Sequence, residues 1–216
     1  MDKNNIILQT TEFVKDKLKN DSSGHDWWHI YRVLTLSRKL QKTEGGDLFI
    51  IELAALLHDV ADWKFNTNEN SGLKIVSDWL ETQRVNSETI KSVLYIIEHI
   101  SYKGEGEAYE MKTIEGKIVQ DADRLDAIGA IGIARTFAFG GYKGNEMHHP
   151  DIKPLANMKF EEYKKTNGTT INHFYEKLLL LKDRMNTKTA QELANSRHEF
   201  MQHYLEKFYR EWEGLE

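Results

Sequence analysis

Apolar residues recur along most of the chain with a helical period of about 3.6 positions. No segment bounded by turns alternates strictly between apolar and polar positions, so the pattern predicts an all-α protein with little strand. Helix ends predicted from sequence hold only to within a few residues. The expected helices cover residues 5–19, 26–42, 47–60, 71–83, 87–100, 114–138, 169–184 and 187–212.

The breaks between the expected helices suggest how the chain is organised. The longest irregular stretch, residues 140–168, carries glycines, two histidines and both prolines, and loops of this length tend to be lids or binding loops. A disordered insert is the alternative. We expect a single domain over residues 1–216 with a core at about 20–140, the loop or lid at about 140–168, and a C-terminal helical extension at about 169–212.

The last expected helix, residues 187–212, has apolar positions at helical spacing and is strongly amphipathic. Its apolar face is expected to pack on the core or, as the alternative, on a second subunit. Both a monomer and a homodimer therefore remain open.

Charge and composition remove several classes of function. The chain has 34 acidic and 29 basic residues, a net charge of −5, which is unlike the basic footprint of a general nucleic-acid binder. There is no cysteine, so any metal must be held by His, Asp and Glu. No apolar run approaches the roughly 18 residues that a membrane span needs. We expect a cytoplasmic protein with no membrane association and no stable nucleic-acid complex.

Three expected helices place an ionisable residue where the apolar pattern points inward. His29 shares a stripe with Val33, His58 ends the stripe of the third helix beside Asp59, and Asp123 lies on the stripe of the sixth. Adjacent helical residues diverge by about 100°, yet from the last turn of a helix both side chains can reach one ion in front of it.

Burying these four side chains is expensive unless they are paired, hydrogen-bonded or bound to metal. A shared divalent cation is the simplest common solution. Two imidazoles and two carboxylates suit Mn²⁺, Fe²⁺, Co²⁺, Ni²⁺ or Zn²⁺ better than Ca²⁺ or Mg²⁺, and they leave coordination positions open for water and substrate. An open position indicates a catalytic metal.

The order of these residues resembles a known signature. His29, the adjacent pair His58-Asp59, and Asp123 within residues 121–126 resemble the HD-domain metal-dependent phosphohydrolases. Residues 24–33, 58–62 and 121–137 extend the resemblance to the YpgQ-like bacterial subgroup, over roughly residues 5–212. The resemblance implies an α-helical HD fold with the metal site between helices, at the mouth of a bundle. It also implies hydrolysis of nucleoside or deoxynucleoside triphosphates to monophosphate and pyrophosphate.

The carboxylates and histidines around the expected ligands have competing roles. Asp123 is assigned as the ligand because it matches the family motif; Asp126 is expected near the ligands or in a salt bridge, and Asp121 in solvent. Asp62 lies one turn after Asp59 and is a candidate general base, or a salt-bridge partner of Lys64. His99 is a candidate for contacting a phosphate or the attacking water, with helix capping as the alternative.

Cations are expected near the phosphates of the substrate. Arg32, Lys64 and Arg124 are the candidates, and Arg124 has neutralisation of Asp121 or Asp126 as its alternative. An interior salt bridge is the alternative for Arg135.

The remaining polar residues have weaker claims to function. His25 is a further candidate for substrate binding, and Asp26 is first a helix N-cap. His148 and His149 are expected to be exposed in the long loop. Surface or helix-packing positions are expected for His173, His198 and His203.

The expected activity is therefore that of a metal-dependent phosphohydrolase on small nucleotides, with Mn²⁺ as the favoured ion and Mg²⁺ possible with the nucleotide. Other HD-type phosphomonoesterases or phosphodiesterases are the near alternative. A diiron oxygenase needs about two further ligands, and His99 is the only histidine between Asp59 and Asp123. A nucleotide sensor without catalysis is the third possibility.

Overall fold

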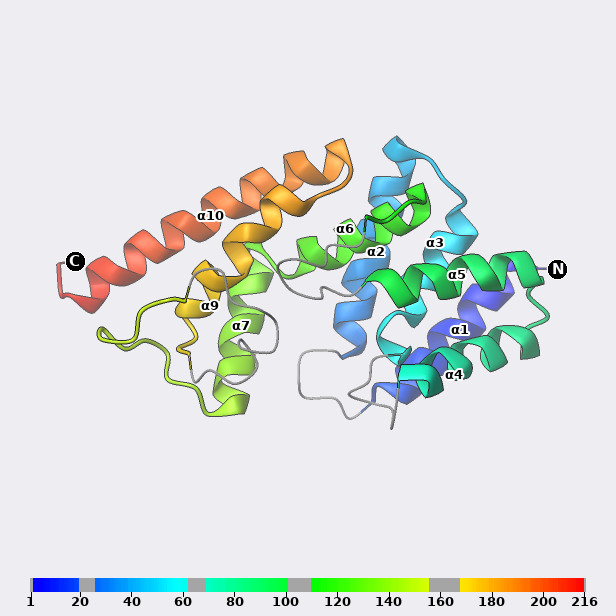
Figure 1. Cartoon of the computed structure of the whole chain (residues 1–216), viewed down its shortest axis with the longest axis horizontal. Helices are drawn as coiled ribbons and strands as arrows, with labels where there is room; N and C mark the ends of the chain where they lie inside the picture. Colours follow the sequence, from blue (N-terminus) through cyan, green and yellow to red (C-terminus); the bar gives the residue numbers. More distant parts are fainter. Residues whose placement is uncertain (1, 20–25, 62–68, 101–109, 156–167, 216) are drawn as a thin grey trace. The chain divides into compact units, whose positions relative to one another are not determined.

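The structure of the chain is a computed structural model that describes residues 2–19, 26–61, 69–100, 110–155 and 168–215 (Figure 1). Within these ranges the chain forms helices and no strand, which confirms the all-α prediction. The elements are α1 (Lys3–Lys17), α2 (Trp27–Glu44), α3 (Leu48–Leu57), the 3-10 turn η1 (Asp59–Ala61), α4 (Glu69–Thr82), α5 (Ser87–Ile100), α6 (Ile114–Asp126), α7 (Gly129–Lys143), α9 (Asn172–Glu176), the 3-10 segment η3 (Leu178–Arg184) and α10 (Lys188–Trp212).

Backbone contacts divide the chain into two compact units. The first comprises Met1–Tyr102 and Ala108–Ala122, and the second comprises Lys103–Glu107 and Asp123–Glu216. The division falls inside α6, so the last turn of this helix belongs to the second unit. The expected single domain stays a prediction, and residues 156–167 of the expected lid lie outside the described ranges.

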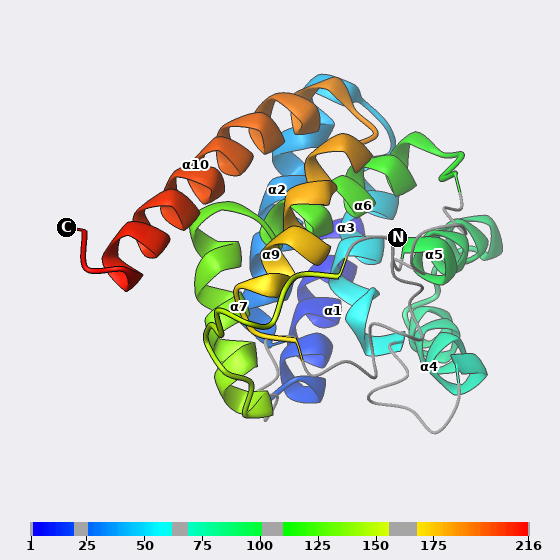
Figure 2. The ribbon, with the colours of Figure 1, turned by 60° about the vertical axis from the view of Figure 1, so that its left-hand side comes forward.

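The core of the first unit is built around α3, which contacts α1, α2 and α5 (Figures 1 and 2). The sequence of α3 is apolar on nearly all sides, as expected of a helix surrounded by others. The run Leu53, Ala54, Ala55, Leu56 and Leu57 is fully buried. The core therefore leads directly to His58, the C-cap residue of α3.

The turn between α2 and α3 explains where α2 ends and α3 begins. Gly45 and Gly46 have φ angles of 83° and 88°, a region that glycine enters without steric cost. Asp47 then caps α3, because its carboxylate accepts hydrogen bonds from the amides of Phe49 and Ile50 at 2.8 and 3.4 Å. The backbone amide of Asp47 in turn donates to Glu115 at 2.9 Å.

The predicted helix over residues 114–138 is wrong in its continuity, because α6 ends at Asp126 and α7 begins at Gly129. Gly129 has a φ of 77°, which interrupts a right-handed helix. A Cβ atom at Gly132 would collide with the carbonyl group of Ala127, so the start of α7 packs tightly against the break. The second helix also runs further than expected, to Lys143.

The second unit packs α10 against α7 and η3. Within this unit the rings of Phe137, Phe174 and Tyr204 pack against one another, with centroids 6.0 to 6.2 Å apart. The predicted helix over residues 169–184 is wrong in type: α9 covers only Asn172–Glu176, and the segment continues as a 3-10 helix after Lys177, whose φ of −140° departs from helical geometry.

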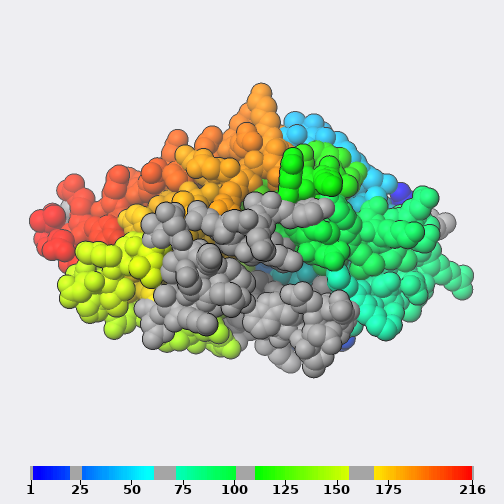
Figure 3. Space-filling view, in the orientation of Figure 1, coloured from blue at the N-terminus to red at the C-terminus, as the bar shows by residue number. Residues whose placement is uncertain are grey.

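The long amphipathic helix predicted for residues 187–212 is confirmed as α10. Its buried side includes Ala190, Ala194, Met201 and Leu205, while Phe200 and Trp212 are exposed. Its orange-to-red side chains reach the surface along the helix in Figure 3. Across the described ranges, no helix combines the length and hydropathy needed to cross a bilayer.

Candidate metal centre

His29, His58 and Asp59 converge in the first unit although they come from different elements. His29 lies on α2, His58 is the C-cap of α3, and Asp59 is the first residue of η1. The Nε2 atoms of His29 and His58 are 3.3 Å apart. Each faces the carboxylate of Asp59, with Nε2–O distances of 3.4 Å. The three residues are 1%, 6% and 6% exposed, so the group is buried. Among the residues that the structure describes, this is the one group of three or more side chains placed to share an ion.

Local structure brings the adjacent pair His58 and Asp59 to one point. His58 has helical angles at the end of α3, and Asp59 starts the 3-10 turn η1. A 3-10 turn winds more tightly than an α-helix, which changes the direction of the side chain that follows His58. The expected convergence of both side chains from the end of a helix is therefore confirmed.

The hydrogen bond at Nδ1 of His58 fixes which ring nitrogen is available. This atom lies 2.9 Å from the backbone carbonyl of Ala55. A carbonyl only accepts, so Nδ1 carries the proton and donates it. In the neutral ring Nε2 then keeps its lone pair, and this is the atom that faces His29 and Asp59. An imidazole oriented in this way is typical of a metal ligand.

The donor set fits a divalent transition metal. Two imidazole nitrogens and a carboxylate lie within 4.8 Å of one another, so one ion can reach all three. A buried carboxylate between two imidazoles is costly unless a cation compensates its charge. Three protein ligands also leave coordination positions for water, as catalytic metal sites require.

The start of α2 holds His29 in place. Asp26 is the N-cap of α2, and its carboxylate accepts a hydrogen bond from the backbone amide of His29 at 2.9 Å. This confirms the expected capping role of Asp26. On the same helix Val33 and Leu40 are fully buried, so the inward stripe predicted for His29 is also confirmed.

Asp123 lies in the last turn of α6, where it is half-buried and belongs to the second unit. Its role as the fourth ligand stays a prediction. The neighbouring acids differ from expectation in one case: Asp121 is fully buried rather than solvated, because its position on α6 faces the interior. Asp126 is also buried and forms a salt bridge of 2.6 Å with Arg135, one of its two expected roles.

The structure locates three of the expected substrate-binding and catalytic residues. Arg32 is half-buried on α2, one turn after His29. Arg124 donates a hydrogen bond to the backbone carbonyl of Arg184. His99 lies in the last turn of α5. The other three candidates, His25, Asp62 and Lys64, lie outside the described residues.

Sequence reasoning missed the residues that fix His99. Its Nδ1 lies 2.7 Å from the carbonyl of Tyr95, so Nδ1 donates there and Nε2 is the atom left for other contacts. Gln120, from α6, donates to the carbonyls of His99 and Ile100 at 3.4 and 3.3 Å. It thereby satisfies carbonyl groups at the end of α5. A buried glutamine on an apolar helix face was the available signal for this contact.

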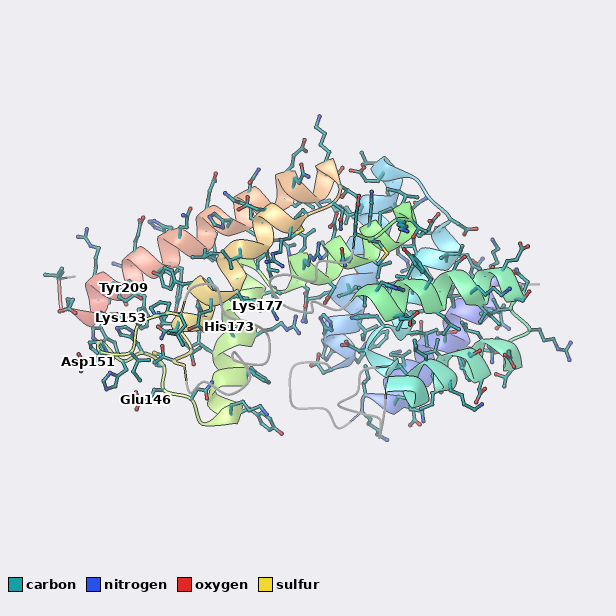
Figure 4. The ribbon with its side chains drawn as sticks, viewed as in Figure 1. Glu146, Asp151, Lys153, His173, Lys177 and Tyr209 are labelled. Atoms are coloured by element: carbon teal, nitrogen blue, oxygen red, sulfur yellow. The ribbon has the colours of Figure 1, made fainter. Side chains whose placement is uncertain are left out.

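His148, His149 and His173 belong to the second unit. His148 and His149 are half-buried, not exposed as expected, and the ring of His148 packs edge-on against Phe208, Tyr209 and Trp212. His173 lies on α9 (Figure 4). Burial and, to a smaller extent, the charge of Lys177 lower the pKa of His173 to about 3.

Comparison with known families and sequences supports the same interpretation. The family described as HD domain matches residues 27–128, a range that contains His29, His58, Asp59 and Asp123. YpgQ of Bacillus subtilis is 41% identical to the chain over 209 residues, which cover 96% of this chain and 94% of YpgQ.

Solved structures are similar over nearly the whole chain. An HD-superfamily hydrolase of Bacillus thuringiensis is 50% identical, with a TM-score of 0.78 over 98% of both chains. The structure of Bacillus subtilis YpgQ in complex with ADP has a TM-score of 0.77 and 38% identity, and the match covers 97% of this chain and 100% of that one.

Proposed function

The chain belongs to the HD superfamily and is a metal-dependent phosphohydrolase, and we propose that it cleaves nucleoside or deoxynucleoside triphosphates to a monophosphate and pyrophosphate. The observation that carries the proposal is the buried convergence of His29, His58 and Asp59. A nucleotide substrate is supported by YpgQ, a relative whose structure contains ADP. Cleavage to pyrophosphate is what the family resemblance of the sequence implies.

The metal ligands in this proposal are His29, His58, Asp59 and Asp123. Nitrogen and oxygen donors in equal number suit Mn²⁺, and also Co²⁺, Ni²⁺, Fe²⁺ or Zn²⁺. Such an ion, when bound, supplies a water of lowered pKa and polarises phosphoryl oxygens. His58 contributes Nε2, because its Nδ1 proton is held by the carbonyl of Ala55.

The residues around the ligands would bind and orient the nucleotide. Arg32 follows His29 by three positions and thus lies on a nearby face of α2, where a guanidinium can grip two phosphate oxygens at once. We assign Lys64, Arg124 and His25 to binding the negatively charged phosphates of the nucleotide as well.

Proton transfer is assigned to Asp62 and His99. A carboxylate one turn after Asp59 is suited to accept a proton from the attacking water. Because Nδ1 of His99 donates to the carbonyl of Tyr95, the neutral ring presents Nε2 as a hydrogen-bond acceptor and the protonated ring presents it as a donor to a phosphate.

The test combines metal analysis with a nucleotide panel on the same preparation. With Mn²⁺ we expect pyrophosphate and monophosphate in equal amounts from triphosphates, while p-nitrophenyl phosphate and cyclic nucleotides stay intact. His58→Ala should lose the metal and lower kcat/KM by about a thousandfold or more, since the buried site loses a ligand. His203→Ala is the matched control, because His203 is an exposed histidine on α10.

Two results would count against the proposal. Metal-loaded protein that leaves every triphosphate intact would exclude the substrate class. Release of inorganic phosphate rather than pyrophosphate would exclude the proposed bond and favour an HD-type phosphomonoesterase.

A further inference from the structure

The last turn of α6 is held by three arginine side chains of the second unit. Arg135, from α7, forms a salt bridge of 2.6 Å with Asp126. Arg197, from α10, donates a hydrogen bond to the backbone carbonyl of Leu125. Arg124, from the turn itself, donates to the carbonyl of Arg184 at the end of η3. This turn is also the one that carries Asp123.

Most helix ends need no such support from distant residues. Carbonyl groups in the last turn have no partner within the helix and are usually satisfied by water or by a local cap. After α6 the chain does tighten locally, because the amide of Ile128 donates to the carbonyl of Leu125 at 3.2 Å. Arg197 adds a second donor to the same carbonyl. Leu125 and Ile128 are 0% and 1% exposed, so this end is closed to solvent.

Arg197 is placed where a guanidinium is costly. The side chain is half-buried, and its aliphatic stem runs against Gly129, where a Cβ atom would lie 2.9 Å from Cγ of Arg197. Burial lowers the pKa of Arg197, while the nearby charge of Asp126 opposes the shift. An apolar residue could fill the same space without this cost, so packing alone does not explain an arginine here.

We propose that Arg197 is a positioning residue for the metal site: by holding the carbonyl of Leu125, it keeps the last turn of α6 in the arrangement that lets Asp123 bind the ion. The C-terminal helix α10 thereby sets metal affinity without contributing a ligand. This inference rests on the proposed role of Asp123 as a ligand. Its geometry lies entirely within the second unit, where Leu125, Gly129 and Arg197 are in contact.

The test measures Mn²⁺ affinity of the full-length, metal-stripped protein by titration calorimetry, without substrate. Arg197→Met keeps the stem that packs on Gly129 and removes the guanidinium. We expect a Kd for Mn²⁺ about tenfold higher, the lower end of the effect of residues that orient metal ligands. Arg197→Lys, which keeps one charged donor, should restore part of the affinity. Arg210→Met changes an exposed arginine of the same helix and should leave the Kd unchanged.

A double-mutant cycle distinguishes positioning from general support of the fold. If Arg197 acts through Asp123, Arg197→Met should weaken Mn²⁺ binding much less in the Asp123→Asn background than in the wild type. At saturating Mn²⁺ the kcat of Arg197→Met should return to within about threefold of the wild-type value, since the defect is in affinity. Should Arg197→Met not fold, Arg197→Lys carries both measurements.

Three outcomes would overturn the inference. One is a lowered melting temperature with an unchanged Kd, which would make Arg197 a brace only. Another is an equal loss of affinity in both backgrounds, which would separate Arg197 from Asp123. The third is Asp123→Asn binding Mn²⁺ as the wild type does. Because the Kd for Mn²⁺ is measured without substrate, a wild-type protein that binds Mn²⁺ but hydrolyses no triphosphate would contradict the proposed function and not this inference.

Discussion

In the first unit the buried side chains of His29, His58 and Asp59 turn their nitrogens and oxygens toward one another, whereas in the second unit buried Asp126 faces the guanidinium of Arg135. Both arrangements bury a carboxylate almost completely. In the second the compensating charge is part of the chain, so folding alone satisfies the acid. In the first the acid is grouped with imidazoles, and in the proposed metal site a cation from solution would complete the charge balance.

This difference indicates which buried charges stabilise the fold and which prepare a site. Removing either partner of a buried salt bridge within the chain lowers the stability of the fold, because the remaining charge is left unpaired in the interior. A group of donors held for a metal gains most of its stability when the metal binds. The two kinds of acid should therefore respond differently to substitution and to chelators.

The largest effect should come from Asp126→Asn. This change leaves Arg135 and Arg197 beside a neutral amide, and we expect the free energy of unfolding to fall by about 3 kcal/mol. Urea denaturation in the presence of EDTA at pH 8 measures it. Asp59→Asn under the same conditions should cost clearly less, because Asp59 faces the Nε2 atoms of two imidazoles, whereas Asp126 faces a guanidinium that is always charged.

Asp78→Asn is the control for that comparison, since Asp78 pairs with Lys74 at the exposed surface of the first unit and should change stability little. Equal losses for Asp126→Asn and Asp59→Asn would contradict the contrast between the two acids.

The second effect in size is stabilisation by the metal. At a free Mn²⁺ concentration about a hundredfold above its Kd, binding should raise the free energy of unfolding by about 2.7 kcal/mol relative to EDTA. Differential scanning calorimetry measures the shift. His58→Ala and Asp59→Asn should abolish it, while Asp78→Asn should preserve it. A shift of the same size in His58→Ala would place the ion elsewhere.

The same contrast explains how much could be predicted from the sequence. His58 and Asp59 are adjacent in the sequence. The ten residues before them form the apolar helix that buries them, so their convergence can be predicted from the local pattern. The capping of His29 by Asp26 is equally local. These parts of the site need no knowledge of what packs against them.

The support of α6 depends instead on residues far apart in the sequence. Arg197 contacts a backbone carbonyl 72 positions earlier. Every residue has such a carbonyl, so the sequence does not indicate which one Arg197 contacts. The break before α7 was missed for a related reason: Gly129 is tolerable in an apolar helical pattern, and its φ of 77° becomes apparent only in the structure. Contacts of this kind are set by tertiary packing, which periodicity does not encode.

The smallest of the three effects concerns His173, a half-buried imidazole of the second unit that lies apart from any group of ligands among the described residues. Its pKa is lowered to about 3 by burial and by Lys177, against an ordinary value near 6.5. Between these values the unfolded chain binds a proton that the folded chain excludes, so the stability contributed by neutral His173 is lost as the pH falls below about 6.5.

From pH 7 to pH 5 this loss should reach about 2 kcal/mol in the wild type. His173→Gln should remove it and flatten the acid limb of the stability profile, as measured by urea denaturation in EDTA. His203→Gln, at an exposed position of α10, should keep the wild-type slope. If His173→Gln and wild type instead lose stability in parallel, the acid sensitivity does not arise from His173, and the contrast between the two units would not extend to this imidazole.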